Sequence, residues 1–257
     1  MHHPGTYLLA PEHADAIQRL AADARIAATT SIPHPYPAQG ARDYIARQLE
    51  DRAAGRGWAF AIMDRDELVG VCGVHGIVPG GTPEVGYWVG VPYWGQGYAS
   101  FGLRLLLEFV FTNLGLERVG ARVLEANPAS ARVLEKNGMR FVCLQPNTDV
   151  TLHPLGVSVA WYALTREEWR AHRDGPALAR LHPALRALLE AELAAGNAVL
   201  ETGSGWPDAD SVFVRLRDPF RARPAALPEG LRYTEPNDPH WWRADISSTA
   251  PRHILAC

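Results

Sequence analysis

The segment Tyr93 to Gly102, YWGQGYASFG, places two glycines one residue apart directly before a helical pattern. Unpaired N–H groups at the start of a helix, together with the helix dipole, form a site for an anion. Gly95 and Gly97 have no Cβ atom, so a diphosphate could lie directly against the backbone. A tight turn or a close strand–helix contact explains the same glycines without a ligand, and the short motif alone favours that simpler interpretation.

Two well-known phosphate-binding motifs fit this segment poorly. A P-loop requires Gly-Lys-Ser/Thr at the start of the helix, and that sequence is absent. A dinucleotide-binding fingerprint requires glycine or alanine at the position of Ser100 and an acidic residue about 20 positions further on. Glu125 lies roughly 30 positions beyond Gly95. A Rossmann-type oxidoreductase is therefore a weak alternative.

The elements that must position the glycine turn follow from hydrophobic periodicity and turn residues. Helices are predicted over 11–26, 41–55, 103–114, 127–138 and 177–195, and strands over 6–10, 57–64, 67–78, 83–91, 117–125, 140–146 and 157–164. The three strands between 57 and 91 are joined by short turns, which predicts an antiparallel meander. Helix start and stop signals flank the later helices, for example Asn127-Pro128 before 127–138 and Gly115 after 103–114.

Composition limits the possible classes of function. The chain has 257 residues with 47% apolar residues, enough for a domain of about 150 residues and a smaller unit. A net charge of -3 gives no reason to expect nucleic acid as a partner. The three cysteines have no metal-like spacing, and no run approaches the length of about 18 apolar residues typical of a membrane span. We expect a cytoplasmic protein with neither a membrane nor a metal partner.

Residues 84–142 closely resemble the acetyl-CoA-binding core of the GNAT N-acetyltransferases. The family's glycine loop, [Q/R]-x-x-G-x-[G/A], aligns with the turn that ends at Ala99, and NPASARVLEKNGMR aligns with a second family element. The similarity is greatest to the branch of ribosomal-protein N-terminal acetyltransferases and extends over about residues 5–170. It implies an α+β fold, with a central mixed, mostly antiparallel sheet flanked by helices.

The resemblance also implies which residues hold the co-substrate, acetyl-CoA. Backbone amides of the glycine loop would bind the CoA diphosphate, and the end of the 83–91 strand would pair with the pantetheine arm. One amide of that strand end would polarise the thioester carbonyl. The expected cofactor-binding residues are Val89, Gly90, Val91, Trp94, Gly95, Gln96, Gly97, Tyr98, Ala99, Ser100, Asn127 and Ser130.

Transfer to an amine also requires a proton acceptor. Glu84 matches a general base that several members use through water, and an exposed carboxylate at the start of a strand is an equal alternative. His75 could share this role because its ordinary pKa lies near neutrality, although a lone strand histidine is more often structural. The tyrosine that many members use as an acid falls at Leu134, which cannot donate a proton. Ser130 is the nearest substitute, and solvent is the other.

We therefore expect a GNAT-like acetyltransferase domain over 1–170 and a small α+β unit of unknown role over 171–257. The expected reaction is direct acetyl transfer from acetyl-CoA to a primary amine, either a peptide N-terminus or a small amine. The acceptor would enter between the 29–40 loop and the loop around 146–156. A non-catalytic acyl-CoA-binding regulatory module is the alternative. The second unit could pack on the core, cover the acceptor cleft or mediate a homodimer.

Overall fold

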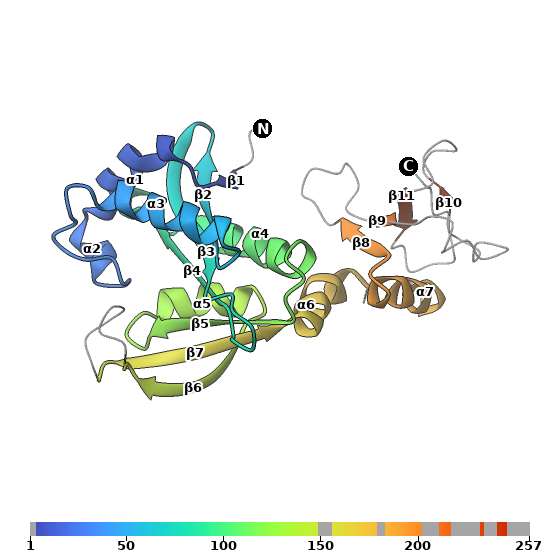
Figure 1. Ribbon diagram of the computed structural model, residues 1–257. Helices are drawn as coiled ribbons and strands as arrows, with labels where there is room; N and C mark the ends of the chain where they lie inside the picture. The colour runs from blue at the N-terminus through green and yellow to red at the C-terminus, as the bar shows by residue number, and fades with distance from the viewer. Residues whose placement is uncertain are drawn as a thin grey trace. The chain divides into compact units, whose positions relative to one another are not determined.

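The computed structural model describes residues 4–148, 156–178, 183–201, 211–216, 232–233 and 241–245. The chain divides into two compact units, Met1–Trp169 and Arg170–Cys257 (Figure 1). Most of the loop expected to bound the acceptor, 146–156, lies outside the described residues. Within the described residues, no helix is both long and apolar enough to cross a bilayer.

A seven-stranded sheet forms the centre of the first unit. Its spatial order is β1-β2-β3-β4-β5-β7-β6. The strands are β1 (Gly5–Leu8), β2 (Trp58–Asp64), β3 (Glu67–His75), β4 (Glu84–Val89), β5 (Arg118–Leu124), β6 (Arg140–Pro146) and β7 (Ser158–Thr165). All neighbouring strands in this sheet pair antiparallel except β4 and β5, which are parallel. The predicted meander and the mostly antiparallel mixed sheet are both confirmed, and this topology does not fit a Rossmann fold.

The helices of the first unit cover both faces of the sheet. They are α1 (Ala14–Ala21), α2 (Ala24–Ala27), α3 (Gly40–Ala53), α4 (Tyr98–Thr112) and α5 (Pro128–Lys136), with 3₁₀ turns η1 (Pro11–His13) and η2 (Val91–Tyr93). One buried cluster joins α1 and α3 to Ala59, Ala61 and Val71 of the sheet. A second cluster joins α4 and α5 to the opposite face. Alternation along β2 therefore directs Ala59 and Ala61 to α1 and α3, and Ile62 to α4.

Two helix predictions need correction. The single helix predicted over 11–26 is divided, because Asp23 adopts an extended backbone and its side chain accepts the Arg25 N–H as an N-cap of α2. Helix α6 (Arg166–Leu178) was not predicted. The start of this helix is marked by a reciprocal pair of hydrogen bonds. Thr165 Oγ1 accepts the Glu168 N–H, and Glu168 Oε2 accepts the Thr165 N–H. This is a capping box of the form T-x-x-E.

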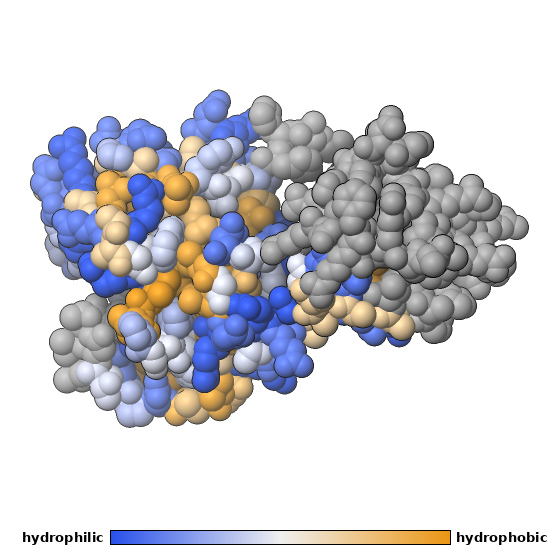
Figure 2. Space-filling view, turned by 45° about the vertical axis from the view of Figure 1, so that its right-hand side comes forward, coloured by the Kyte–Doolittle hydropathy of each residue, from blue (hydrophilic) through white to orange (hydrophobic). Residues whose placement is uncertain are grey.

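Strand β6 forms one edge of the sheet and is exposed along its whole length. Its apolar side chains Phe141, Val142 and Leu144 are among the large hydrophobic groups on the surface. Figure 2 has hydrophobic surface at the bottom of the molecule, at the level where Figure 1 draws β6. Open apolar edge strands invite pairing with another chain. The homodimer stays a prediction.

The described part of the second unit contains the C-terminal part of α6, one further helix and a four-stranded antiparallel sheet. The further helix is α7 (Pro183–Ala194), which begins later than the predicted 177–195. The sheet has the order β10-β11-β9-β8 and is made of β8 (Ala198–Glu201), β9 (Ser211–Leu216), β10 (Arg232–Tyr233) and β11 (Trp241–Asp245). The mixed α+β character expected for this unit is present in these elements. The assignment of 171–257 as a separate domain stays a prediction, and its role stays unassigned.

Replacing Gly70 tests how closely β3 and β4 pack. A Cβ atom at Gly70 would meet the backbone carbonyl oxygen of Trp88 and lie 3.0 Å from the Val89 Cα, so the backbone of β4 would have to shift. We expect Gly70→Ala to lower the free energy of unfolding by about 1–3 kcal/mol. Gly86→Ala is the matched control, because a Cβ at Gly86 meets nothing within 4 Å. Urea denaturation of both variants measures the difference, and equal stabilities would contradict this packing.

Candidate functional site

The two parallel strands β4 and β5 pair at a single position. Glu84 lies opposite Gly120, and the Gly120 N–H donates to the Pro83 carbonyl at 2.9 Å. Beyond this point no further β4–β5 register is formed, although β4 continues to Val89 and β5 to Leu124. The rest of β4 is therefore paired on its β3 side only, which leaves backbone groups directed into the gap between the strands.

Backbone alternation identifies which groups face this gap. The Gly90 N–H donates to Val69 of β3 at 2.8 Å, so Gly90 points away from β5. The N–H and C=O of the preceding residue, Val89, point to the opposite side. Consistent with this, the Val89 carbonyl accepts the indole N–H of Trp94 at 2.6 Å. The Val89 N–H therefore faces the gap, while the Gly90 amide is already occupied.

The glycine turn enters α4 through two residues with left-handed backbone. Gly95 has a φ of 75° and Gly97, the N-cap of α4, has a φ of 88°. A Cβ atom at either position would meet nothing within 4 Å, so the turn is open on its outer side. The first turn of α4 contains no acidic residue. The N–H groups of this first turn form the positive end of a 15-residue helix, which is suited to an anion.

The glycine turn forms one wall of a cleft, which we call the glycine-turn cleft. Its cavity volume is about 400 Å³. Nine of the predicted cofactor-binding residues line it: Val89, Trp94, Gly95, Gly97, Tyr98, Ala99, Ser100, Asn127 and Ser130. Gly90, Val91 and Gln96 are not in the lining, and the Gln96 side chain donates back to the Pro92 carbonyl.

Two cations from α5 also line the glycine-turn cleft. Arg132 and Lys136 lie four residues apart, so they share one face of the helix. The end of α5 is held against the first turn of α4, since the nearly buried Asn137 donates from Nδ2 to Ser100 Oγ at 3.1 Å. The positive charge that the sequence of α4 lacks at its start is thus supplied by α5. Neither residue was predicted to belong to the site, although both lie inside the NPASARVLEKNGMR element.

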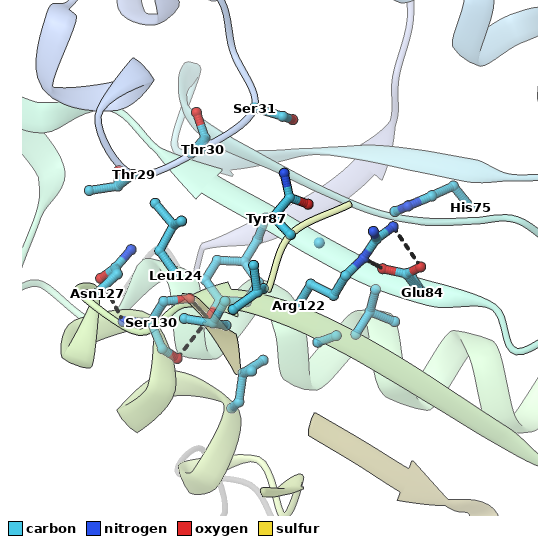
Figure 3. Close-up of a pocket in the computed structure, with 17 residues that line it drawn as sticks. Thr29, Thr30, Ser31, His75, Glu84, Tyr87, Arg122, Leu124, Asn127 and Ser130 are labelled. Atoms are coloured by element: carbon cyan, nitrogen blue, oxygen red, sulfur yellow. Dashed lines mark hydrogen bonds and ion pairs between the residues drawn. The ribbon is translucent and has the colours of Figure 1, made fainter. Parts of the chain in front are cut away.

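A second, smaller cavity lies on the other side of the gap, and we call it the histidine cavity. It has a volume of about 170 Å³ and contains all three predicted catalytic residues, His75, Glu84 and Ser130. Figure 3 shows His75 above the pair formed by Glu84 and Arg122. His75 and Glu84 are cross-strand neighbours in the β3–β4 register.

The environment of His75 favours its neutral form. Partial burial penalises the imidazolium and lowers the pKa of His75 below its ordinary value; the nearby Glu84 opposes this shift and Arg122 adds to it. Part of the side chain remains exposed, so the imidazole can be reached from solvent. A neutral imidazole at neutral pH can accept a proton.

Glu84 is engaged by a residue that the sequence did not connect with it. Arg122 donates from Nε to Oε2 at 2.7 Å and from its terminal nitrogen to Oε1 at 2.9 Å. The two side chains are largely buried, at 27% and 20% exposure. Because both carboxylate oxygens accept from one guanidinium, Glu84 has fewer free lone pairs for a proton or a water. The charged Arg122 in the middle of an apolar strand was the only sequence signal for this pair.

The two cavities meet at a small group of shared residues. Both are lined by Thr29, Thr30, Tyr87, Asn127 and Ser130. The Tyr87 hydroxyl lies 2.8 Å from Ser130 Oγ and 3.0 Å from the Ser130 carbonyl oxygen. Asn127 Oδ1 accepts the Ser130 N–H at 3.1 Å, which makes Asn127 the N-cap of α5 as the sequence predicted. Tyr87 was missed, although it lies two residues before Val89 on the same strand.

Leu134, which the resemblance places at the position of the tyrosine that many family members use as a proton donor, is fully buried and lines the histidine cavity. Its side chain has no proton to donate, as expected. The residues around this cavity therefore offer a neutral imidazole, an ion pair and a serine–tyrosine contact. This combination suits a reaction in which a proton leaves one reactant and charge develops on another.

Comparison with known proteins agrees with this geometry. The family model described as "Acetyltransferase (GNAT) domain" matches residues 7–140. The N-acetyltransferase p20 of Bacillus licheniformis, described as uncharacterised, is 31% identical over 133 residues, which cover 51% of this chain and 74% of that protein. The chain spans about half the length of several other curated relatives that it matches.

Solved structures share the fold. A ribosomal L7/L12 α-N-protein acetyltransferase in complex with coenzyme A has a TM-score of 0.58 and 20% identity, covering 63% of this chain and 93% of that chain. Spermidine N-acetyltransferase from Vibrio cholerae, in complex with coenzyme A and spermine, has a TM-score of 0.56 and 15% identity, covering 65% and 97%. The predicted fold class and family resemblance are confirmed. The chain belongs to the GNAT acetyltransferase family.

Proposed function

We propose that the protein transfers an acetyl group directly from acetyl-CoA to a primary amine, without a covalent enzyme intermediate. The observation that carries the proposal is the gap between β4 and β5, which joins the glycine-turn cleft to the histidine cavity. One side of the gap suits a phosphorylated donor, and the other side holds a candidate base. Two reactants approaching from opposite sides would meet at the shared residues, which is the proximity that acyl transfer needs.

The donor would bind through its diphosphate at the glycine turn. The amides of Gly97 to Ser100 and the cations Arg132 and Lys136 surround the same cleft, and both kinds of group attract phosphate. The remaining predicted residues, Gly90, Val91 and Gln96, would act through the shape of the turn, since they do not line the cleft. Acetyl-CoA fits this donor set because it carries a diphosphate and a narrow arm.

The pantetheine arm would lie along the unpaired side of β4. Strand-like pairing there needs free backbone groups, and the Val89 N–H faces this side. This N–H is also the candidate donor to the thioester carbonyl, where negative charge develops during attack. The sequence predicted that one of the amides of Val89 to Val91 would be this donor. The Gly90 amide is already bonded to Val69, so Val89 is the better candidate.

The base that we favour is His75. Its lowered pKa keeps the imidazole neutral at neutral pH, whereas both oxygens of Glu84 are bound by Arg122. Glu84 would then orient Arg122 and balance its charge. A water between His75 and the amine would complete the proton path.

The acceptor would carry a single amine next to neutral polar groups. Among the described residues that line the histidine cavity, Glu84 and Arg122 offset each other's charge. The other polar groups described there are the His75 imidazole and hydroxyls and amides such as those of Thr30, Ser31 and Asn147. A polyamine needs carboxylates for its additional ammonium groups. A peptide N-terminus or a small monoamine fits better.

A thiol-release assay with a panel of amines tests the proposal. Acetyl-CoA and either short peptides or small monoamines should yield free CoA in an amine-dependent manner, and spermidine should be the weakest acceptor. CoA binding without amine-dependent release from any acceptor would instead favour a non-catalytic acyl-CoA-binding module. A non-catalytic module would explain why Leu134, which cannot donate a proton, lies in the site.

Replacing Gly97 should weaken donor binding. Valine at a φ of 88° is strained, and it would disturb the start of α4. We expect Gly97→Val to weaken CoA binding roughly 10- to 100-fold, measured by calorimetry. Gly55→Val is the matched control, since Gly55 follows α3 with a φ of 69° and open space around it. Equal affinities in the two variants would argue against the glycine turn as the diphosphate site.

Activity should depend on pH through His75. The neutral imidazole is the active form, so kcat/KM should fall as the pH falls through the lowered pKa of His75, below 6.5. His75→Gln should lower kcat/KM about 100-fold and remove this acidic limb of the profile. The control variant His172→Gln, in α6, should retain the wild-type kcat/KM and the acidic limb of the pH profile. An unchanged acidic limb in His75→Gln would assign the base elsewhere.

A further inference from the structure

Tyr87 and Ser130 contact each other, and both belong to the described residues that line the two cavities. The tyrosine comes from β4 and the serine from α5, 43 positions apart in the chain. The phenol oxygen lies within hydrogen-bonding distance of both Ser130 Oγ and the Ser130 carbonyl oxygen. The Ser130 N–H donates to Asn127 Oδ1. Ser130 is thus fixed at its backbone and contacted at its side chain.

The proposed reaction leaves negative charge on sulfur. When the amine nitrogen forms its bond to the acetyl carbon, the C–S bond breaks and its electron pair stays on the CoA sulfur. Leu134 has no hydrogen to offer this sulfur. A serine hydroxyl can donate one, but it rotates freely unless a partner fixes it. A hydroxyl held in one direction stabilises developing charge without reorganising.

Tyr87 is suited to fix the serine because it stays protonated. Burial raises the pKa of Tyr87 above its ordinary value, and the hydrogen bond with Ser130 opposes this only in part. The phenol therefore carries its hydrogen at every working pH. The phenol donates this hydrogen to the Ser130 carbonyl oxygen at 3.0 Å, and Ser130 Oγ lies at 2.8 Å from the same phenol oxygen. When the two serine oxygens share the phenol hydrogen, the serine hydrogen is left for another acceptor.

Resting on the proposed function, we infer that Tyr87 is a positioning residue that directs the Ser130 hydroxyl at the sulfur of the departing CoA. Ser130 donates a hydrogen bond and keeps its proton. The proton lost by the amine passes to His75 or water, and solvent later protonates the thiolate, so the proton balance closes. Ser130 then stabilises the leaving thiolate in place of the tyrosine that many family members carry in α5. Tyr87 of β4 orients its hydroxyl.

Conservative variants separate this role from a structural one. Tyr87→Phe removes only the hydroxyl and should lower kcat about tenfold, the effect of one hydrogen bond. Ser130→Ala should lower kcat at least as much, and the double variant should match Ser130→Ala alone, because Tyr87 acts through Ser130. Tyr162→Phe is the control, since its hydroxyl donates to Glu135 and it lines neither cavity.

Binding of CoA itself gives a readout independent of catalysis. A hydroxyl aimed at sulfur stabilises the bound thiolate and lowers the pKa of the bound thiol below the value for free CoA. CoA affinity should therefore rise with pH towards that value in the wild type and in Tyr162→Phe. The rise should be lost in Tyr87→Phe and Ser130→Ala. Calorimetry at several pH values measures it.

Desulfo-CoA, which lacks the thiol, separates this effect from other titrations. Besides Tyr87 itself, the titratable and charged groups among the described residues that line the two cavities are His75, Glu84, Arg122, Tyr93, Tyr98, Arg132 and Lys136. Their ionisation acts on both ligands alike, so the difference between CoA and desulfo-CoA reports the thiol. If the pH-dependent difference in affinity between CoA and desulfo-CoA is equal in the wild type and in Tyr87→Phe, the inference is overturned and the proposed function stays intact. Failure of the wild type to bind either ligand overturns the proposed function instead.

Discussion

The whole site depends on the point where β4 and β5 stop pairing. Among the described residues, the backbone register between β4 and β5 consists of one parallel pair, Glu84 with Gly120. Trp161 lies over Gly120, where any side chain would collide with the indole ring. Past this contact the two strands no longer share a register, and β4 presents unpaired backbone in the middle of a folded domain. Unpaired buried backbone groups are costly, so this edge is suited to a ligand that pairs with it.

Charges are arranged on the two sides of this gap according to what each side has to hold. The start of α4 and the cations of α5 make one side positive. On the other side the Glu84–Arg122 ion pair neutralises itself and leaves a neutral imidazole as the reactive group. An anionic donor and a neutral amine are thereby directed to opposite sides. The shared residues Tyr87, Asn127 and Ser130 connect them without carrying a formal charge.

Local features of the sequence predicted the elements well, because periodicity, caps and glycine turns act over a few residues. The Asn127 cap and the glycine turn before α4 are examples. Contacts between distant elements could not be predicted in the same way. The partner of Glu84 is 38 positions away on a parallel strand, and that of Tyr87 is 43 positions away on a helix. Glu84 was therefore expected to be either a base or an exposed carboxylate, without its Arg122 partner, and the Tyr87 hydroxyl was overlooked.

Amide hydrogen exchange by NMR tests the central claim most directly. CoA should protect the Val89 amide, which faces the gap, whereas adenosine 3′,5′-bisphosphate, which lacks the pantetheine arm, should not. The Gly90 amide provides an internal control, because its bond to Val69 should keep it protected with and without ligand. Unchanged exchange at Val89 under saturating CoA would contradict strand-like binding in the gap between β4 and β5.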